Sequence, residues 1–583
     1  MRRTLLYIFC LAIGTLAQAK DYHVNPADGE FAIEKALQQS RLDRIHEGIT
    51  DVHLKLQKGT FRISQPIIIR PEDNGMTIEG VKGTVISGGI KIEGWKKHGR
   101  LFVAPQPTFN GQPLNFRQLY INGRKATRAR DVEDFEKMFR IISVDKKKEC
   151  LYVPAAAVRK LVKEHKDRYD AELVLHEMWC VANLRIKDIV MMGDSAAVFF
   201  HQPESHIHFM HPWPSPMVTK DGHNSAFYIM SKTFLDTPGE WWLDDYNHLV
   251  YYYPKEGDTT DDIEVPAIET LLKVEGTPDE PVKNVKISNI TFEKSTWLRP
   301  SEEGHAPLQA GMYLIEAYKV KPKIERVDDH KLDNQGWVGR PSAAILLNGA
   351  EDVSFTHCTI QHTGATGIDY HRYTKDGGIF DCTFTDIAGS AIVAGSFGEE
   401  NHEAHLPYNP SDEREICDGL VINNNYIKDV ANEDWGCIGI AAGFVKNIKI
   451  THNEISDVSY TGISLGWGWN RQPCAMKNNL VHANLIHHYA KHMYDTAGVY
   501  TLGNQPNTFI TENVVRDIYT PGYAHDPHHW FYLYTDEGSS NITVKDNWTP
   551  EEKYLQNANG PGNIWENNGP KVSETIKAQA GRR

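Results

Sequence analysis

The stretch Asn424-Asn425-Tyr426-Ile427 sets a pattern of asparagine followed by apolar residues that returns along the C-terminal half of the chain. Its later copies are His452-Asn453-Glu454-Ile455, Ala483-Asn484-Leu485-Ile486, Glu512-Asn513-Val514-Val515 and Asp546-Asn547-Trp548. Counted from Asn425, the asparagines are spaced by 28, 31, 29 and 34 residues. A repeat of this length predicts one short-strand turn of a solenoid, with a loop of variable length.

Such a turn cannot bury its apolar face alone, whereas stacked turns pair every backbone edge and enclose a continuous core. The pattern therefore predicts an all-β fold, a right-handed parallel β-helix. The recurring asparagine suits a left-handed corner and can hydrogen-bond to its copy in the next turn. Cys358 and Cys382 precede similar apolar pairs, so we expect them in the same position.

The pattern is interrupted in the N-terminal half of the chain. We expect a cap and first coils over residues 20–99, and an inserted β-rich domain over 100–275, where the repeat stops and longer strands appear. The main β-helix with the active site should span 276–567. Residues 568–583 form a polar C-terminal tail that we expect to be frayed.

The N-terminus has the features of a signal peptide over residues 1–19. Arg2 and Arg3 precede a short apolar run, which ends at Ala17-Gln18-Ala19. A periplasmic or secreted protein is therefore expected. No later segment has about 20 consecutive apolar residues, so no membrane association is expected. The net charge of −14 and the dispersed cationic residues argue against a nucleic-acid partner. The sequence does not specify an oligomeric state.

Two aspartates in the last coils are candidates for catalysis. Asp495 and Asp536 stand beside apolar strands that should stack on adjacent coils, which would set both carboxylates against one cleft. Cleavage of a glycosidic bond needs two such groups, one to protonate the leaving oxygen and one to activate water or attack the sugar. Glu537 follows Asp536 directly and is a candidate either to take its place or to hold a substrate hydroxyl. The alternative for each aspartate is that it only caps a turn.

Further candidates for sugar contacts lie in the same region. Trp467 and Trp469 stand among glycines, which predicts an exposed aromatic platform, with core packing as the alternative. His492 precedes Asp495 on its loop. His525 and His528 have a spacing that a metal could use, but no carboxylate partner is assured, so we expect no metal and no cofactor.

Several motifs resemble glycoside hydrolase family 141, over most of the chain after the signal peptide. The motifs are Tyr494-Asp495-Thr496-Ala497-Gly498-Val499-Tyr500-Thr501-Leu502-Gly503, Tyr534-Thr535-Asp536-Glu537-Gly538-Ser539-Ser540, Arg117-Gln118-Leu119-Tyr120-Ile121-Asn122-Gly123, Phe234-Leu235-Asp236-Thr237-Pro238-Gly239-Glu240-Trp241 and Trp467-Gly468-Trp469. The family includes an α-L-fucosidase acting on the pectin rhamnogalacturonan II and a xylanase. The resemblance implies that Asp495 and Asp536 are the catalytic pair. Thr496-Ala497 stands where the family often has two glycines, a departure that concerns substrate specificity.

The sequence thus favours a glycoside hydrolase acting on a plant cell-wall polysaccharide, with an α-L-fucoside as the first candidate. Two alternatives stay open. A polysaccharide lyase needs a basic residue, for which His371, Arg372 and Lys375 are the clustered candidates. A non-catalytic glycan-binding β-helix would need no paired carboxylates.

Overall fold

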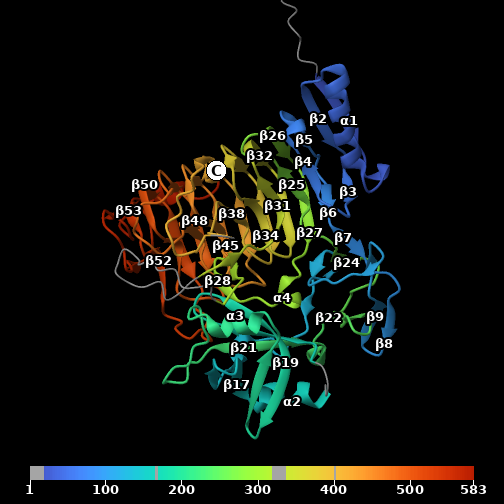
Figure 1. Cartoon of the computed structure of the whole chain (residues 1–583), viewed down its shortest axis with the longest axis vertical. Helices are drawn as coiled ribbons and strands as arrows, with labels where there is room; N and C mark the ends of the chain where they lie inside the picture. The colour runs from blue at the N-terminus through green and yellow to red at the C-terminus, as the bar shows by residue number, and fades with distance from the viewer. Residues whose placement is uncertain (1–18, 165–168, 318–335, 400–401) are drawn as a thin grey trace, which may run out of the picture.

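The computed structural model describes residues 19–164, 169–317, 336–399 and 402–583. The expected signal peptide, apart from Ala19, lies outside the described residues. The described chain forms three long sheets of 15, 9 and 10 strands, here named A, B and C. They stack as a solenoid, the fold predicted from the repeat (Figure 1). No described helix is long and apolar enough to cross a bilayer.

Each complete turn of the solenoid, or coil, passes through sheets A, B and C in that order. Sheet A contains β1 (Ala19–Val24), β2 (Asp51–Leu56), β5 (Met76–Glu79), β26 (Val282–Ser288), β32 (Ala350–Thr356), β35 (Thr374–Lys375), β36 (Gly378–Phe380), β39 (Cys417–Asp418), β40 (Val421–Asn423), β43 (Val445–Lys446), β44 (Lys449–Thr451), β47 (Leu480–His482), β50 (Asn504–Thr511), β53 (Ser540–Lys545) and β55 (Ile564–Glu566). Sheet B contains β3 (Gly59–Arg62), β6 (Thr84–Ser87), β27 (Thr291–Ser295), β33 (Thr359–Thr363), β37 (Thr383–Ile387), β41 (Tyr426–Val430), β45 (Glu454–Val458), β48 (Leu485–Tyr489) and β51 (Val514–Ile518). Sheet C contains β4 (Ile67–Ile69), β25 (Leu272–Glu275), β31 (Ala343–Asn348), β34 (Thr366–Tyr370), β38 (Ile392–Ala394), β42 (Ile440–Ala442), β46 (Ile463–Leu465), β49 (Thr496–Thr501), β52 (Trp530–Thr535) and β54 (Tyr554–Gln556). Neighbouring strands within these sheets pair in parallel, as in β45–β48 and β49–β52.

The corner between sheets A and B carries the predicted asparagine ladder. Asn453 donates from Nδ2 to Oδ1 of Asn484 at 2.9 Å, and Asn484 donates in the same way to Asn513 at 2.9 Å. The ladder extends from Asn425 to Asn568. Cys382 occupies the same position, since its backbone N–H donates to Oδ1 of Asn425. Buried apolar side chains of all three sheets fill the interior beneath the ladder. Each coil therefore satisfies the polar groups of its corner by hydrogen bonds and buries its apolar side chains in the core.

Residues between the first coils and the main solenoid form a separate lobe, seen below the helix in Figure 1. The chain leaves the solenoid after β6 and returns at β25, which pairs with β4 on one side and β31 on the other. One sheet of the lobe contains β7 (Gly89–Lys91), β12 (Tyr120–Ile121), β13 (Arg124–Lys125) and β24 (Ile263–Pro266); a second contains β8 (Lys96–His98), β9 (Leu101–Pro105), β14 (Thr127–Arg128), β22 (Glu240–Asp244) and β23 (Leu249–Tyr252). The third contains β15 (Phe139–Arg140), β16 (Ser143–Asp145), β17 (Cys150–Pro154), β18 (Ala171–His176), β19 (Val181–Met192), β20 (Ser195–Phe200) and β21 (Ala226–Ser231), and the lobe also carries α2 (Ala155–Glu164), α3 (Glu204–Met210) and the hairpin of β10 (Thr108–Phe109) and β11 (Gln112–Pro113). We call residues 88–266 the insertion.

Long loops of the solenoid meet the insertion. The segment after β27 forms α4 (Arg299–Glu302) and a small sheet of β28 (Pro307–Gln309), β29 (Met312–Leu314) and β30 (Val338–Gly339). There Asn183 of β19 and His305 exchange two backbone hydrogen bonds of 2.9 and 2.8 Å. Farther along the solenoid, His176 of β18 contacts the backbone oxygen of His492 through Nε2 at 2.8 Å. The insertion is therefore fixed against the loops that join sheets B and C.

Both ends of the described chain pack on the solenoid. The helix α1 (Ala32–Glu47) buries Ile33 and Leu37 in the core beside the first coils. At the other end, α5 (Glu574–Gln579) leads to Arg583, whose backbone N–H donates to Oδ1 of Asn424 at 2.6 Å. The expectation of a frayed tail is wrong, because this polar segment finds hydrogen-bond acceptors on the outer surface of the coils.

Candidate active site

Asp495 lies at the corner where the chain passes from sheet B to sheet C. It directly precedes β49, and its backbone N–H donates to the carbonyl of His529 on the next coil at 2.7 Å. The side chains of the same two residues form an ion pair, with 3.1 Å between Oδ1 of Asp495 and Nε2 of His529. Tyr460, one coil earlier, donates its hydroxyl to the backbone oxygen of Asp495 at 2.9 Å. The earlier coil thus holds the backbone of Asp495, and the next coil holds both its backbone and its carboxylate.

Asp536 lies on the coil after Asp495, at the opposite end of the paired strands, where sheet C passes to sheet A. It follows β52, and only 8% of its surface is exposed. Tyr500 donates its hydroxyl to Oδ2 at 2.5 Å, and Asn557 donates from Nδ2 to Oδ1 at 2.7 Å. Burial raises the pKa of Asp536 to about 6, the charges of Asp495 and Glu537 act in the same direction, and these two hydrogen bonds oppose them.

The outer face of sheet C connects the two carboxylates. Val499 and Leu533 point into the central core, whereas their neighbours Tyr500 and Tyr534 belong to a cluster on the outer face. Burial, and then the charges of Asp495 and Asp536, raise the pKa of Tyr534 far above its ordinary value. Asp495 and Asp536 therefore act electrostatically on each other and on the same hydroxyl, across a face built from β49 and β52. The structure places the two aspartates that the sequence singled out on adjacent coils, at opposite ends of the paired strands β49 and β52.

The prediction of an exposed platform at Trp467 is wrong. Only 1% of this side chain is exposed, and its ring packs edge-on against Phe397 with 4.8 Å between centroids. The flanking glycines do not project the loop into solvent. Gly466 and Gly468 adopt φ values of 104° and 90°, which favour glycine, and a Cβ at Gly468 would lie 2.9 Å from the ring of Phe444. They let the loop fold down onto the coils, which buries Trp467.

The other predicted contact residues have different surroundings. Trp469 stays partly exposed and packs against His405 and Trp467. His492 stacks on Trp435 with 4.2 Å between ring centroids, and burial lowers the pKa of His492 to about 3, so the ring is neutral. Glu537 is partly exposed beside Asp536.

The remaining basic residues considered from the sequence are engaged in other contacts. His525 bonds through Nδ1 to the hydroxyl of Tyr494. Within the described ranges, no group of three or more potential ligands is arranged to hold a metal ion. Arg372 and His371 face Glu399 at 3.4 and 3.6 Å, and Lys375 lies 3.7 Å from the carboxylate of Asp376. These pairings give none of the three the position of a lyase base.

Sequence reasoning missed the residues that hold the carboxylates. Tyr500 lies within a motif quoted from the sequence. Its strand was expected to stack on the strand that precedes Asp536, and this stacking could have predicted the contact between the two residues. His529 follows the His525 and His528 pair in the sequence, and nothing in that pattern connects it to Asp495. Asn557 and Tyr460 lie outside the motifs, and no pattern in the sequence connects them to the aspartates.

A cavity of about 230 Å³ opens between the insertion and the solenoid, next to this site. His492 and Trp435 line it from the loops between sheets B and C, and Arg130, Phe135 and Asn183 line it from the insertion. His492 stands three residues before Asp495 on the same loop. His492 therefore connects the wall of the cavity to the loop that carries Asp495.

Comparisons with known proteins identify the family. A model of the GH141 insertion domain matches residues 99–255, and a model of the right-handed β-helix region matches 280–471 and 343–549. A solved structure described as a glycoside hydrolase superimposes with a TM-score of 0.94 and 55% identity, over 97% of this chain and 99% of that chain.

More distant similarities add nothing to the assignment. The Streptococcus pneumoniae surface adhesin PfbA has a TM-score of 0.41 and 10% identity, over 94% of this chain and 97% of that one. An exopolygalacturonase from Thermotoga maritima has a TM-score of 0.34 and 11% identity, over 94% and 93%. No curated protein matches the sequence. The insertion match, the solenoid and the similarity along almost the whole chain place this protein in glycoside hydrolase family 141, as a glycosidase built on a parallel β-helix.

Proposed function

We propose that Asp536 is the general acid of this glycosidase and that Asp495 is its base or nucleophile. The observation that carries the proposal is the contrast between the environments of the two carboxyl groups. Asp536 is buried with a pKa of about 6, whereas Asp495 is paired with His529 at 3.1 Å. Pairs of carboxyl groups in such different environments divide the acid and base roles in glycoside hydrolysis.

The proton balance follows from these environments. A general acid must still hold its proton near the pH at which the enzyme works, and a raised pKa serves that purpose. The contact with Asp495 raises the pKa of His529, which favours the imidazolium form of this side chain. Asp536 then protonates the leaving oxygen, while Asp495 activates water or attacks the sugar.

The proposed substrate is a plant cell-wall polysaccharide. The resemblance to family 141 supports a terminal α-L-fucoside of pectic rhamnogalacturonan II as the first candidate and a xylan-type substrate as the second. The proposed sugar contacts are His492, Glu537 and the exposed part of Trp469. Each stands on a loop next to a strand of sheet C. The ion pairs of His371, Arg372 and Lys375 disfavour a lyase that acts through them.

The test is hydrolysis of aryl glycosides by Asp536→Asn and Asp495→Asn. We expect both to lose several orders of magnitude in kcat on aryl α-L-fucosides with poor leaving groups. With an activated dinitrophenyl leaving group, Asp536→Asn should regain much of its rate because that bond breaks without a proton, whereas Asp495→Asn should not. Asp526→Asn, which changes an exposed carboxylate on the loop before β52, is the matched control. Near-normal rates in either active-site variant would reject the assignment.

We also propose that the protein is exported to the periplasm or secreted. The support is the cationic start, apolar run and Ala17-Gln18-Ala19 pattern of the first residues. Expression of the full chain, followed by fractionation and N-terminal sequencing of the product, tests this. A mature chain starting at Lys20 in the exported fraction is the expected result, and an unprocessed chain in the cytoplasm would contradict it.

A further inference from the structure

The cavity between the insertion and the solenoid contains a cation that has no anionic partner. Three other cationic residues line the cavity, and each is neutralised: Arg117 and Arg128 by Glu172 at 3.0 and 2.9 Å, and Lys125 by Asp386 at 2.7 Å. Arg130 differs from them. Its guanidinium lies over the ring of Phe135, 4.6 Å from the centroid, and forms no ion pair with any carboxylate of the described residues.

The surroundings of Arg130 place its charge inside the cavity. Burial is the main cause of the lowered pKa of His492 and of the raised pKa of Tyr228. The charge of Arg130 adds to the first shift and opposes the second, and both residues line the same cavity. Phe135 and His492 contact each other with 5.5 Å between ring centroids. The guanidinium therefore lies beside Phe135, which in turn contacts His492 on the loop that carries Asp495.

The other walls of the cavity suit a sugar ring. Trp435 and Phe135 contribute apolar aromatic wall, and their rings pack edge to face with 4.8 Å between centroids. Four buried polar atoms of lining residues make no hydrogen bond to the described residues. Two of them, Nε2 of His305 and Oδ2 of Asp434, face each other as an ion pair at 3.3 Å, which leaves Oδ1 of Asn183, an acceptor, and Nδ1 of His305. Aromatic walls with a few convergent polar groups are typical of ligand sites, and a volume of about 230 Å³ exceeds that of one pyranose ring.

We propose that this cavity binds a sugar that carries a carboxylate, a uronate, and that Arg130 is the ligand of the carboxylate. A planar guanidinium without a partner binds a carboxylate through two parallel hydrogen bonds, which a neutral hydroxyl or hydroxymethyl group cannot form. This names the substrate class of the active site. It rests on the proposed function, which places the cleaved bond at Asp495 and Asp536. The uronate occupies the position next to the sugar held by Asp495 and Asp536.

The test compares uronates with their neutral counterparts on the whole protein. Galacturonic acid against galactose, and glucuronic acid against glucose, are titrated by calorimetry or ligand-observed NMR. We expect each uronate to bind at least about tenfold more tightly than its neutral partner, the gain of one charge-assisted hydrogen-bond pair. Equal binding of uronate and neutral sugar would overturn the proposal without any variant.

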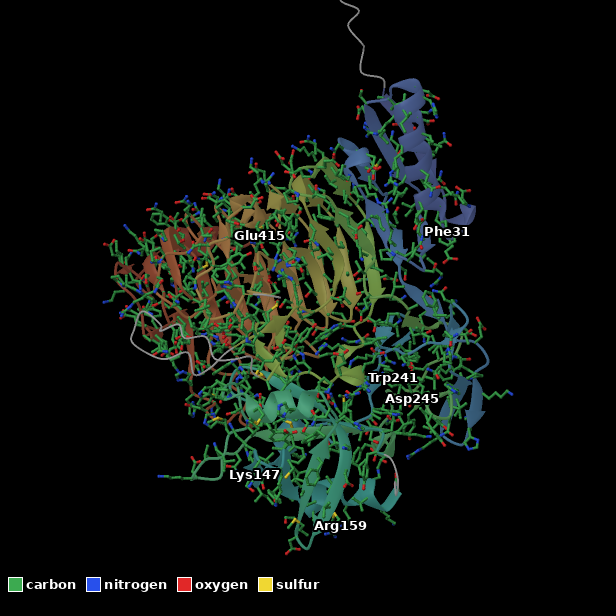
Figure 2. The ribbon with its side chains drawn as sticks, in the orientation of Figure 1. Phe31, Lys147, Arg159, Trp241, Asp245 and Glu415 are labelled. Atoms are coloured by element: carbon green, nitrogen blue, oxygen red, sulfur yellow. The ribbon has the colours of Figure 1, made fainter. Side chains whose placement is uncertain are left out.

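Variants assign the preference to one side chain. Arg130→Gln should reduce uronate binding to the level of the neutral sugar. Arg130→Lys should retain part of the preference, because lysine keeps the charge but cannot donate two parallel hydrogen bonds to the carboxylate. Arg159→Gln is the matched control, since Arg159 is an exposed arginine of α2 at the far end of the insertion (Figure 2). An unchanged preference in Arg130→Gln, with a wild-type melting temperature, would refute the role of Arg130.

The same titration in Asp536→Asn separates this inference from the proposed function. The variant should lose hydrolysis and still bind uronates as the wild type does. A variant that keeps hydrolysis and binds uronates rejects the catalytic assignment alone. If Asp536→Asn loses hydrolysis, but neither it nor the wild type binds uronates more tightly than neutral sugars, only the present inference is rejected.

Discussion

The hydroxyl of Tyr500 donates a hydrogen bond of 2.5 Å to Oδ2 of Asp536, from one coil of the solenoid to the next. This bond favours the ionised carboxylate, whereas burial favours the protonated acid and dominates, since the pKa of Asp536 is raised to about 6. Tyr500 thus sets how far the acid is displaced from its ordinary pKa.

Replacement of Tyr500 by phenylalanine should move the basic limb of the activity profile. Without the hydroxyl the carboxylate loses a donor, the pKa of Asp536 rises further, and the acid keeps its proton to higher pH. We expect the basic limb of kcat/KM to shift upward by about one pH unit. Tyr519→Phe is the control, because the hydroxyl of Tyr519 bonds to Asp457, on sheet B. A basic limb that stays in place would contradict the role of Tyr500.

Asp536→Asn should stabilise the protein at neutral and alkaline pH. An acid whose pKa is raised from 3.8 to about 6 in the folded state keeps its proton to a higher pH there than in the unfolded state. The free energy of unfolding therefore falls as the pH rises through this window, by about 3 kcal/mol in total. Urea denaturation should show the variant more stable than wild type at pH 8, with the difference vanishing near pH 4. A gain that is independent of pH would show that burial of charge is not its origin.

His529→Gln should weaken the fold only where the histidine is protonated. The hydrogen bond to Asp495 raises the pKa of His529, so the stabilisation is fully present below the ordinary histidine pKa and is lost as the pH rises through the raised value. The side chain of His529 is 38% exposed, so solvent screening keeps the effect below about 1 kcal/mol. Melting temperatures of the variant and wild type should differ at pH 5.5 and coincide at pH 9. His528→Gln, at an exposed neighbour, should leave both unchanged.

Asn484→Ala should destabilise the solenoid strongly. Asn484 is fully buried, accepts a bond from Asn453, and donates bonds to Asn513 and to the carbonyl of Ile450. Its loss leaves buried donors and acceptors unpaired, which costs about 2–4 kcal/mol in the free energy of unfolding.

Two further variants calibrate this ladder measurement. Asn484→Cys should lose less stability than Asn484→Ala, because a sulfur already accepts the ladder bond between Cys358 and Cys382. Asn409→Ala removes one exposed side-chain hydrogen bond and should change stability by less than about 0.5 kcal/mol. Equal losses in all three variants would contradict a special contribution of the ladder.

The sequence was sufficient to predict the solenoid because the repeat acts locally. Each asparagine faces its own copy one coil away, so the ladder from Asn425 to Asn547 depends on a spacing that can be read directly from the chain. The same regularity placed Asp495 and Asp536 on adjacent coils. Neither conclusion required knowledge of how the loops pack.

The rest of the site depends on loops and on contacts between distant segments. Trp467 is buried because its loop folds onto Phe397 and Phe444, and glycines beside a tryptophan do not specify the direction in which a loop folds. The cavity forms only where the insertion meets the solenoid, through contacts such as that of His176 with His492, 316 residues apart. No periodicity relates such positions, so the cavity and Arg130 could not be predicted.

The order in which the ribosome makes this chain has a consequence for its biogenesis. Lys125 of the insertion bonds to Asn432, which is synthesised 307 residues later. The residues of the insertion that line the cavity are therefore synthesised before the coils that line its other side. Arg117 and Arg128 share a carboxylate of their own lobe, Glu172, so these two charges are neutralised within the insertion without any contribution from the later coils.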